Sequence, residues 1–370
     1  MRKKHKADLD TPCLVLDMDI LEGNLAKMQT AARHCGKNLR PHVKTHKCSA
    51  LAKKQIEAGA TGLCVAKVSE AAALVKAGLE NILITGPVVT PGKIDRMLDL
   101  LVSCPSLMVV VDHPQSVDLL ESRLRERTLS LGVLLDVDVG LHRTGVRPDQ
   151  APALAERIIS SPHLRLQGIQ AYAGQVQHIK AYDERKQTSL QCLQPAVRIF
   201  NRLRTLVPTC TIFSTSGTGT YDIDPAVEEI TELQVGSYVL MDAEYLAIEP
   251  AGEMQTAPPF PPALRLLTTV VSSNQDAFVT VDAGLKSLYK DGAKPRVIVS
   301  EASSLEYEWF GDEYGKISAG NAGRLPELGS VLELVVSHCD PTVNLFDRYY
   351  LIRGEDVVGT WEIDLRGCSQ

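Results

Sequence analysis

The chain has 370 residues, of which 44% are hydrophobic and 23% charged, and its formal net charge is −6. This composition is ordinary for a soluble globular protein, and no apolar run approaches the roughly 20 residues that a membrane-spanning helix needs. The acidic balance, without a broad basic stripe, argues against a nucleic-acid surface, and nine scattered cysteines without a C-x-x-C pair favour reduced thiols over a disulfide framework or a zinc ribbon.

The first predicted elements are an extended stretch over residues 11–16 and a helix over residues 19–34. Residues 39–47 follow and read LRPHVKTHK, a strand with a cationic tip, before a helix that opens at the capping-type Ser49. Many α/β enzymes present a reactive group in this way. Lys44 is the candidate, because a lysine at a dry strand end loses its proton easily and suits Schiff-base chemistry with a carbonyl. The alternative interpretation is a solvated basic turn.

From this point strand-like and helix-like segments alternate. The strands are predicted at residues 39–44, 62–67, 82–86, 107–112, 131–137, 166–172, 211–214 and 233–240. The helices between them are predicted over residues 69–77, 91–102, 114–127, 150–160 and 179–206. About eight such units match a closed (β/α)₈ barrel with a parallel sheet. A doubly wound open sheet is the competing fold, but no G-x-G-x-x-G follows the first strand.

The carboxyl ends of the predicted barrel strands carry many polar and ionisable groups. Such ends face a common site in parallel barrels. They hold His42, Lys44, Lys67, the loop of residues 138–145 with Arg143, Tyr172, the loop of residues 214–220, and Tyr238. The loop after the seventh strand, with Ser214, Gly217, Thr218 and Gly219, is typical of phosphate binding through hydroxyls and backbone N–H groups, although alone it could be a flexible turn. A phosphate site opposite a Schiff-base lysine indicates pyridoxal phosphate.

The composition changes near Ile248, where Pro and Gly residues accumulate over residues 249–262. Beyond this boundary we predict short strands and an antiparallel barrel or sandwich. One of its strands, residues 331–336, leads into His338 and Asp340. Residues two apart in an extended chain share a face, so this pair could form half of a divalent metal site, with a hydrogen-bonded surface pair as the alternative.

Taken together, residues 41–47, 138–145, 214–221 and 338–345 resemble the D-threonine aldolase and D-serine dehydratase family, which comprises pyridoxal-phosphate enzymes of the alanine-racemase fold type. The resemblance covers nearly the whole chain. It implies a (β/α)₈ barrel over residues 17–248, and a β-rich domain of residues 1–16 and 249–370 that carries the metal site. It also implies a head-to-tail homodimer, with the active site between one barrel and the β domain of the partner subunit.

The resemblance also implies roles for individual residues. Lys44 matches the lysine that forms the Schiff base with the cofactor, and His338 and Asp340 match the metal ligands, which gives His338 a catalytic role. The remaining matches lie around the cofactor: His42, Arg143 and Tyr172, and, less closely, Ser214, Gly217, Thr218, Gly219 and Tyr238 on the phosphate side. Family dehydratases tend to carry cysteine at the second ligand position and the aldolases aspartate. An oxygen ligand favours manganese, magnesium or cobalt over zinc.

The resulting hypothesis is a cytoplasmic, metal-dependent lyase that cleaves D-3-hydroxy amino acids, such as D-threonine, to glycine and an aldehyde. A dehydratase acting on D-serine or D-3-hydroxyaspartate could use the same residues. Racemisation ranks third, because it needs two bases on opposite faces of the substrate and has no use for a metal site. A non-catalytic pyridoxal-phosphate carrier is the alternative from a different class, but the additional β module argues against it.

Overall fold

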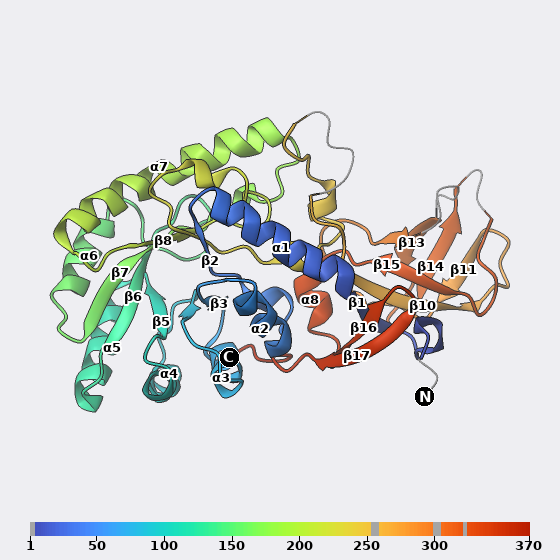
Figure 1. Ribbon diagram of the computed structural model, residues 1–370, viewed down its shortest axis with the longest axis horizontal. Helices are drawn as coiled ribbons and strands as arrows, with labels where there is room; N and C mark the ends of the chain where they lie inside the picture. The colour runs from blue at the N-terminus through green and yellow to red at the C-terminus, as the bar shows by residue number, and fades with distance from the viewer. Residues whose placement is uncertain (1–3, 253–258, 299–304, 321–323) are drawn as a thin grey trace. The chain divides into compact units, whose positions relative to one another are not determined.

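The computed structural model describes residues 4–252, 259–298, 305–320 and 324–370, and its internal contacts divide it into two compact units (Figure 1). The barrel unit comprises Lys27–Lys44, Leu51–Gly236 and Gly367–Gln370. The β unit comprises the residues up to Ala26, Thr45–Ala50 and Ser237–Arg366. Among the helices of the described residues, none combines the length and apolar character that a membrane crossing requires.

Eight parallel strands form the sheet of the barrel unit, in the order β2-β9-β8-β7-β6-β5-β4-β3. The strands are β2 (Asn38–Leu39), β3 (Leu63–Val65), β4 (Ile82–Ile84), β5 (Met108–Val111), β6 (Leu131–Asp136), β7 (Leu164–Gln170), β8 (Ile212–Thr215) and β9 (Glu232–Leu233). A parallel bridge between His42 and Cys64 joins the two ends of this sheet and closes it. The predicted (β/α)₈ fold class is therefore confirmed.

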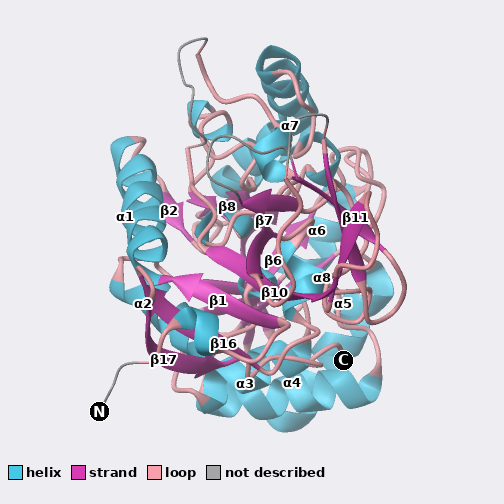
Figure 2. Cartoon of the chain, turned by 90° about the vertical axis from the view of Figure 1, so that its right-hand side faces the viewer, coloured by secondary structure: helices cyan, strands magenta, loops and turns pink. Residues whose placement is uncertain are grey.

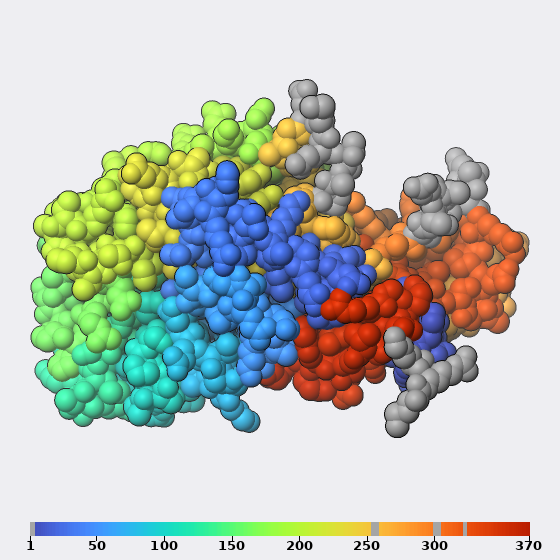
Figure 3. All heavy atoms as spheres, in the orientation of Figure 1, coloured from blue at the N-terminus to red at the C-terminus, as the bar shows by residue number. Residues whose placement is uncertain are grey.

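Helices alternate with these strands along the chain. They are α1 (Met18–His34), α2 (Ser49–Glu57), α3 (Val68–Lys76), α4 (Pro91–Ser103), α5 (Pro114–Arg127), α6 (Ala151–Ile159) and α7 (Tyr182–Leu206). Figure 3 shows α3, α4 and α5 (light blue to teal) side by side on the surface of the barrel unit. Every residue of β3, β5 and β6 is buried, as expected for parallel strands that are covered on both faces.

Two of the predicted barrel strands are reduced to two residues each. The strand predicted over residues 39–44 contributes only β2, because Pro41 has no N–H for the ladder and the chain then forms a 3₁₀ turn, η2 (Val43–Thr45). The strand predicted over residues 233–240 ends at Leu233 and passes into a second 3₁₀ turn, η5 (Ser237–Val239).

The β unit contains a second, mostly antiparallel sheet. Its strands are β1 (Cys13–Asp17), β10 (Leu264–Ser272), β11 (Phe278–Val281), β12 (Arg296–Ile298), β13 (Leu305–Trp309), β14 (Gly315–Ala319), β15 (Val331–Val335), β16 (Arg348–Arg353) and β17 (Asp356–Glu362). The long strand β10 pairs with β15 on one edge and with both β1 and β11 on the other, which closes a six-stranded barrel through β12, β13 and β14. The antiparallel barrel that the sequence predicted is present.

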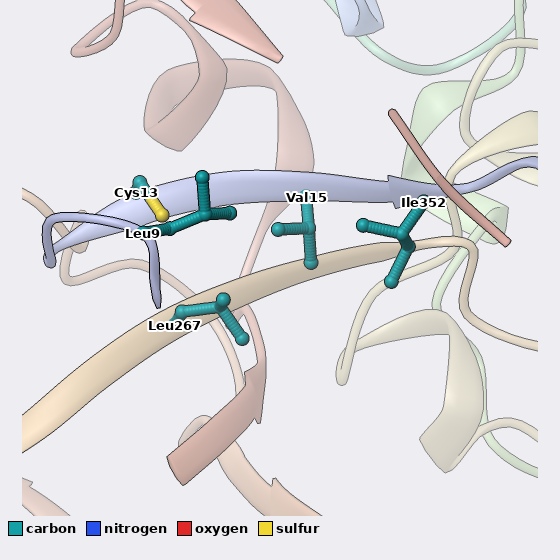
Figure 4. Packing of buried hydrophobic residues seen from close by; sticks show 5 residues of the cluster. All are labelled: Leu9, Cys13, Val15, Leu267 and Ile352. Atoms are coloured by element: carbon teal, nitrogen blue, oxygen red, sulfur yellow. The ribbon is translucent and has the colours of Figure 1, made fainter. Parts of the chain in front are cut away.

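The N-terminal strand β1 belongs to this second sheet. It pairs antiparallel with β10 and parallel with β16, and Figure 2 shows the three strands together. The register places Cys13, Val15, Leu267 and Ile352 on one face, where Leu9 joins them in a buried apolar cluster (Figure 4).

Candidate functional site

Lys44 lies on the η2 turn, just beyond the carboxyl end of β2. Its neighbours Val43 and Thr45 are buried, whereas the Lys44 side chain is exposed. The dry surroundings expected for this amine are therefore not provided by the chain as the structure describes it. The backbone is fixed, because Lys44 N donates to His42 Nδ1 at 3.3 Å. The arrangement presents an accessible amine on an anchored turn.

His42 is buried and has protein partners at both ring nitrogens, and its expected place at the cofactor stays a prediction. Its Nε2 lies 3.1 Å from Thr85 Oγ1, and its Nδ1 accepts the Lys44 N–H. The Thr85 hydroxyl donates its hydrogen to the Val65 carbonyl at 3.1 Å, so its lone pairs face His42. This pattern places the ring hydrogen on Nε2. His42 thus stabilises the Lys44 turn by accepting its backbone hydrogen bond, while Thr85 holds the other ring nitrogen.

Arg143 and Tyr172 approach each other on neighbouring loops. The guanidinium carbon of Arg143 lies 5.8 Å from the centre of the half-buried Tyr172 ring, within cation–π range. The Arg143 loop is shaped by Asp138, whose Oδ1 accepts the backbone N–H groups of Gly140 (2.9 Å) and His142 (3.0 Å). The same loop lines a cavity of about 840 Å³. Pro114 of α5 and Arg157 of α6 are also part of the cavity lining, whereas Tyr172 is not. The cation and the aromatic face that a planar ligand could meet are therefore those of the Arg143–Tyr172 pair itself.

The loop after β8 is buried, and it forms hydrogen bonds within itself and with Gln177. Gly219 N donates to Gln177 Oε1 at 3.0 Å, and Gly217 N donates to Thr220 Oγ1 at 3.3 Å. A Cβ at Gly219 would lie 2.1 Å from the Gln177 carbonyl oxygen, and one at Gly217 would lie 2.4 Å from Gln177 Oε1. The glycines therefore allow close packing against Gln177, and their predicted place at a phosphate stays a prediction. Thr218 is also buried.

A buried carboxyl group, Asp224, supports this loop. It accepts hydroxyl hydrogen bonds from Ser189 and Thr220, each at 2.6 Å. Burial raises the pKa of Asp224 to about 6, although these hydroxyl groups favour the charged form. The loop is thus held by side chains that the sequence analysis did not single out.

A chain of polar residues, all buried except the half-buried Thr85, also crosses the carboxyl ends of the barrel strands. We call it the mouth network; its members are Thr85, Asp136, Gln170, Ser214 and Gln234. Gln170 Nε2 donates to Asp136 Oδ1 (3.0 Å) and to the Thr85 carbonyl (3.2 Å), while Gln234 Nε2 donates to Gln170 Oε1 (3.0 Å). A polar residue at the carboxyl end of an otherwise apolar strand is the sequence signal that could have revealed this network.

Tyr238 lies in the β unit, on η5. Its ring is buried and packs edge-to-face on Phe260, with ring centres 5.8 Å apart. The contacts of Tyr238 described here are thus with its own unit, and its role at the phosphate stays a prediction.

The residues predicted as metal ligands lie at the start of a short helix, α8 (Cys339–Val343), and not on a strand. Asp242 starts this helix by accepting the Cys339 N–H at 3.1 Å, and Pro341 is tolerated in the first turn. His338 retains an extended backbone, and its Nε2 faces Asp340 Oδ2 at 3.7 Å. The expectation of an extended chain was wrong, yet the two side chains come together.

The other ring nitrogen of His338 has a carboxylate partner as well. Nδ1 lies 3.0 Å from Asp291 Oδ2. A carboxylate on one imidazole nitrogen fixes the tautomer and leaves the other nitrogen for a metal, which is how many metal-bound histidines are oriented. Within the described ranges no group of three or more His, Cys, Asp and Glu residues could enclose an ion. The donor set fits an open site with two protein ligands.

Comparison with known proteins relates the chain to one group of enzymes. A family model described as the alanine racemase N-terminal domain matches residues 16–244, and one described as a putative serine dehydratase domain matches residues 263–352. The chain is 37% identical to the D-threonine aldolase of Arthrobacter sp., over 98% of this chain and 94% of that protein. It is 33% identical to the 3-hydroxy-D-aspartate aldolase of Paracoccus denitrificans (strain Pd 1222), over 98% and 93%. The solved structure of D-threonine aldolase from Filomicrobium marinum matches with a TM-score of 0.93 at 34% identity, covering 100% of this chain and 99% of that one.

Proposed function

The chain belongs to the pyridoxal-phosphate-dependent family of D-threonine aldolases and D-serine dehydratases, which are lyases, and from this premise we propose that it cleaves D-3-hydroxy amino acids in a metal-dependent retro-aldol reaction. The preferred substrate is D-threonine, which yields glycine and acetaldehyde. The observation that carries the choice of aldolase is the oxygen ligand Asp340, which faces His338 Nε2 at 3.7 Å.

The barrel unit fits the cofactor at several points. Lys44 would bind its aldehyde, because it carries an amine at the carboxyl end of β2 on a turn that is anchored by His42. Arg143 and Tyr172 would flank the ring. On the phosphate side the proposed contacts are Ser214, Gly217, Thr218 and Gly219, and Tyr238 of the β unit is a further proposed member. We propose residues 17–248 as the cofactor barrel, and residues 1–16 with 249–370 as the metal-bearing domain.

The metal would be held by His338 and Asp340, with Asp291 fixing the imidazole. A hard carboxylate oxygen beside one nitrogen favours manganese, with magnesium or cobalt as alternatives and zinc as the weaker candidate. A bound divalent cation supplies Lewis acidity, which lowers the pKa of a coordinated hydroxyl group.

The chain's own residues would act at two atoms of the substrate. Bound pyridoxal phosphate supplies an electron sink for the charge that develops on the α-carbon. Lys44 and Arg143 would hold and orient the cofactor at the carboxyl ends of the barrel strands. His338 and Asp340 would hold the cation beside the 3-hydroxyl oxygen, which would favour loss of the hydroxyl proton. The Cα–Cβ bond breaks, the hydroxyl oxygen becomes the aldehyde oxygen, and one proton returns to the α-carbon.

A dehydratase is the second candidate, because the family contains dehydratases as well as aldolases. The solved D-threo-3-hydroxyaspartate dehydratase of Delftia sp. HT23 matches with a TM-score of 0.85 at 25% identity, over 97% of this chain and 99% of that one. In this alternative Lys44 would remove the α-proton and the 3-hydroxyl would leave.

We also propose that the enzyme is a cytoplasmic homodimer whose active sites each combine one barrel with the β domain of the partner. Its cysteines support the location, because none of the nine, all of which lie within the described residues, forms a disulfide. The homodimer is proposed from family membership.

A two-substrate assay tests the proposed function. Purified protein with pyridoxal phosphate and manganese is incubated with D-threonine and, separately, with D-serine. We expect acetaldehyde from D-threonine, and its loss in the presence of a chelator. Pyruvate from D-serine without acetaldehyde from D-threonine would refute the aldolase.

A further inference from the structure

The mouth network centres on Gln170, the last residue of β7. Its amide group makes three hydrogen bonds: two donated by Nε2, to Asp136 Oδ1 (3.0 Å) and to the Thr85 carbonyl (3.2 Å), and one accepted by Oε1 from Gln234 (3.0 Å). Both hydrogens of the amide are used. Gln170, Gln234 and Asp136 are each at most 5% exposed, so water does not compete for these bonds.

The orientation of this amide is fixed by its partners. Asp136 and the Thr85 carbonyl are acceptors, so only the NH₂ group of Gln170 can face them. Gln234 Nε2 donates both to Gln170 Oε1 and to Ser214 Oγ (2.8 Å), so reversing the Gln170 amide would leave two amide nitrogens facing each other. No other uncharged side chain of this length can satisfy the three partners at once.

Hydrogen bonds lead from Gln170 to three parts of the candidate site. Through Thr85 they reach the His42 ring and the backbone N–H of Lys44. Through Asp136 they reach Thr144, whose hydroxyl donates to Asp136 Oδ2 at 3.0 Å next to Arg143. The third connection, through Gln234, ends at Ser214, where β8 enters the loop of residues 214–220.

We infer that Gln170 is a positioning residue, which holds the Lys44 turn and the Arg143 loop at a fixed separation around the cofactor. The inference rests on the proposed function, because it supposes that Lys44 binds pyridoxal phosphate. Gln170 touches neither the cofactor nor the substrate in this role. It acts by preventing the two loops from shifting independently of the barrel strands.

The test compares matched variants. Gln170→Glu keeps the shape of the side chain but replaces both N–H donors with oxygen, and so sets two carboxylates against each other at Asp136. Gln187→Glu introduces the same charge change on the exposed surface of α7 and serves as its control. Thr144→Val removes only the last hydrogen bond on the Arg143 side, at an exposed position that does not threaten folding. Thr144→Ser restores that hydroxyl.

For each variant we would measure the dissociation constant of pyridoxal phosphate, its visible absorbance band, kcat and KM for D-threonine, and the thermal unfolding midpoint. We expect Gln170→Glu to weaken cofactor binding by about tenfold or more and to alter the band, while Gln187→Glu matches the wild type. Thr144→Val should weaken binding by about threefold at an unchanged unfolding midpoint, with recovery in Thr144→Ser.

Two results would overturn the inference. One is a Gln170→Glu protein with wild-type cofactor affinity, band and kcat. The other is a loss of cofactor binding in Gln170→Glu that is fully explained by a lower unfolding midpoint, together with a Thr144→Val protein that binds the cofactor like the wild type. Failure of the proposed function looks different, because the wild-type protein itself would then bind no pyridoxal phosphate or release no acetaldehyde.

Discussion

The imidazole Nε2 of His338 faces the carboxylate Oδ2 of Asp340 at 3.7 Å, although the backbone between them turns into helix α8. Both side chains are mostly buried, with exposed fractions of 25% for His338 and 16% for Asp340. The pair therefore offers one nitrogen and one oxygen donor in fixed positions, and the proposed choice of metal and reaction depends on that oxygen.

Replacing this oxygen should change the metal. Asp340→Ala should retain cofactor but lose metal-dependent turnover, because a single imidazole cannot hold the ion. Asp340→Cys should shift the preference from manganese toward zinc, since a thiolate is a softer ligand. Metal analysis after incubation with both ions measures this preference. Wild-type activity of Asp340→Ala in the presence of a chelator would remove the metal from the mechanism.

Asp291 should tune metal affinity without binding the ion. Its Oδ2 lies 3.0 Å from His338 Nδ1, and 56% of its side chain is exposed, so Asp291→Asn should fold normally. We expect metal affinity to fall by about tenfold, within the range known for partners of metal-bound histidines. Titration of the metal-free protein measures it. Asp312→Asn, an equal charge change on an exposed loop, should leave the affinity unaltered.

Lys44→Ala should abolish the visible absorbance band of bound pyridoxal phosphate, because no amine would remain on the η2 turn to form the Schiff base. Lys67→Ala, at the N-cap of α3, is the control and should retain the band. If the band persists in Lys44→Ala, then Lys47 or Lys67 binds the cofactor instead.

Mixing two inactive variants tests whether the site is shared between subunits. In a dimer that combines the Lys44 of one chain with the His338 of the other, heterodimers of Lys44→Ala and His338→Ala contain one intact site. Denaturing and refolding the mixture should then restore about a quarter of wild-type activity, since half of the dimers are mixed. A mixture without activity would place both residues of each site in one chain.

The buried carboxyl of Asp224 predicts a pH-dependent stability difference. Its pKa in the folded protein is raised to about 6 by burial, with Asp222 adding to the rise, so its stabilising contribution is complete below pH 4 and lost as the pH rises through 6. Asp224→Asn has no carboxyl group at this position, so its stability does not fall in this way as the pH rises. Relative to wild type, the variant should gain up to about 3 kcal/mol between pH 4 and pH 7. Thermal unfolding of both proteins across this range measures the difference. A difference independent of pH would contradict the assignment.

The sequence predicted the barrel elements well, because their local signals agree. α5 occupies the predicted residues 114–127, where Pro114 opens the helix and the His113 side chain caps it. The buried strands β5 and β6 are short runs of aliphatic residues, and a period of alternating strands and helices leaves few topologies besides a parallel barrel. Where the chain turns into η2 and η5, the strand predictions extended too far.

Local pattern could not reveal the partners of polar side chains that are distant in sequence. Gln170 meets Thr85, Asp136 and Gln234 only because closing the barrel brings the ends of separate strands together. Asp242 starts α8 from a residue 97 positions away, and so converts a predicted strand end into the helix that presents Asp340.

By itself the sequence determined the two kinds of secondary structure, their order, and the residue types available for chemistry, since these depend on short-range periodicity and side-chain identity. Only the tertiary structure decided that the His42 ring lies against Thr85, that the glycines of the loop after β8 pack against Gln177, and that Asp291 orients His338. These relationships depend on distances between segments that no local interaction fixes, and burial makes each unmatched polar group costly enough to select one arrangement.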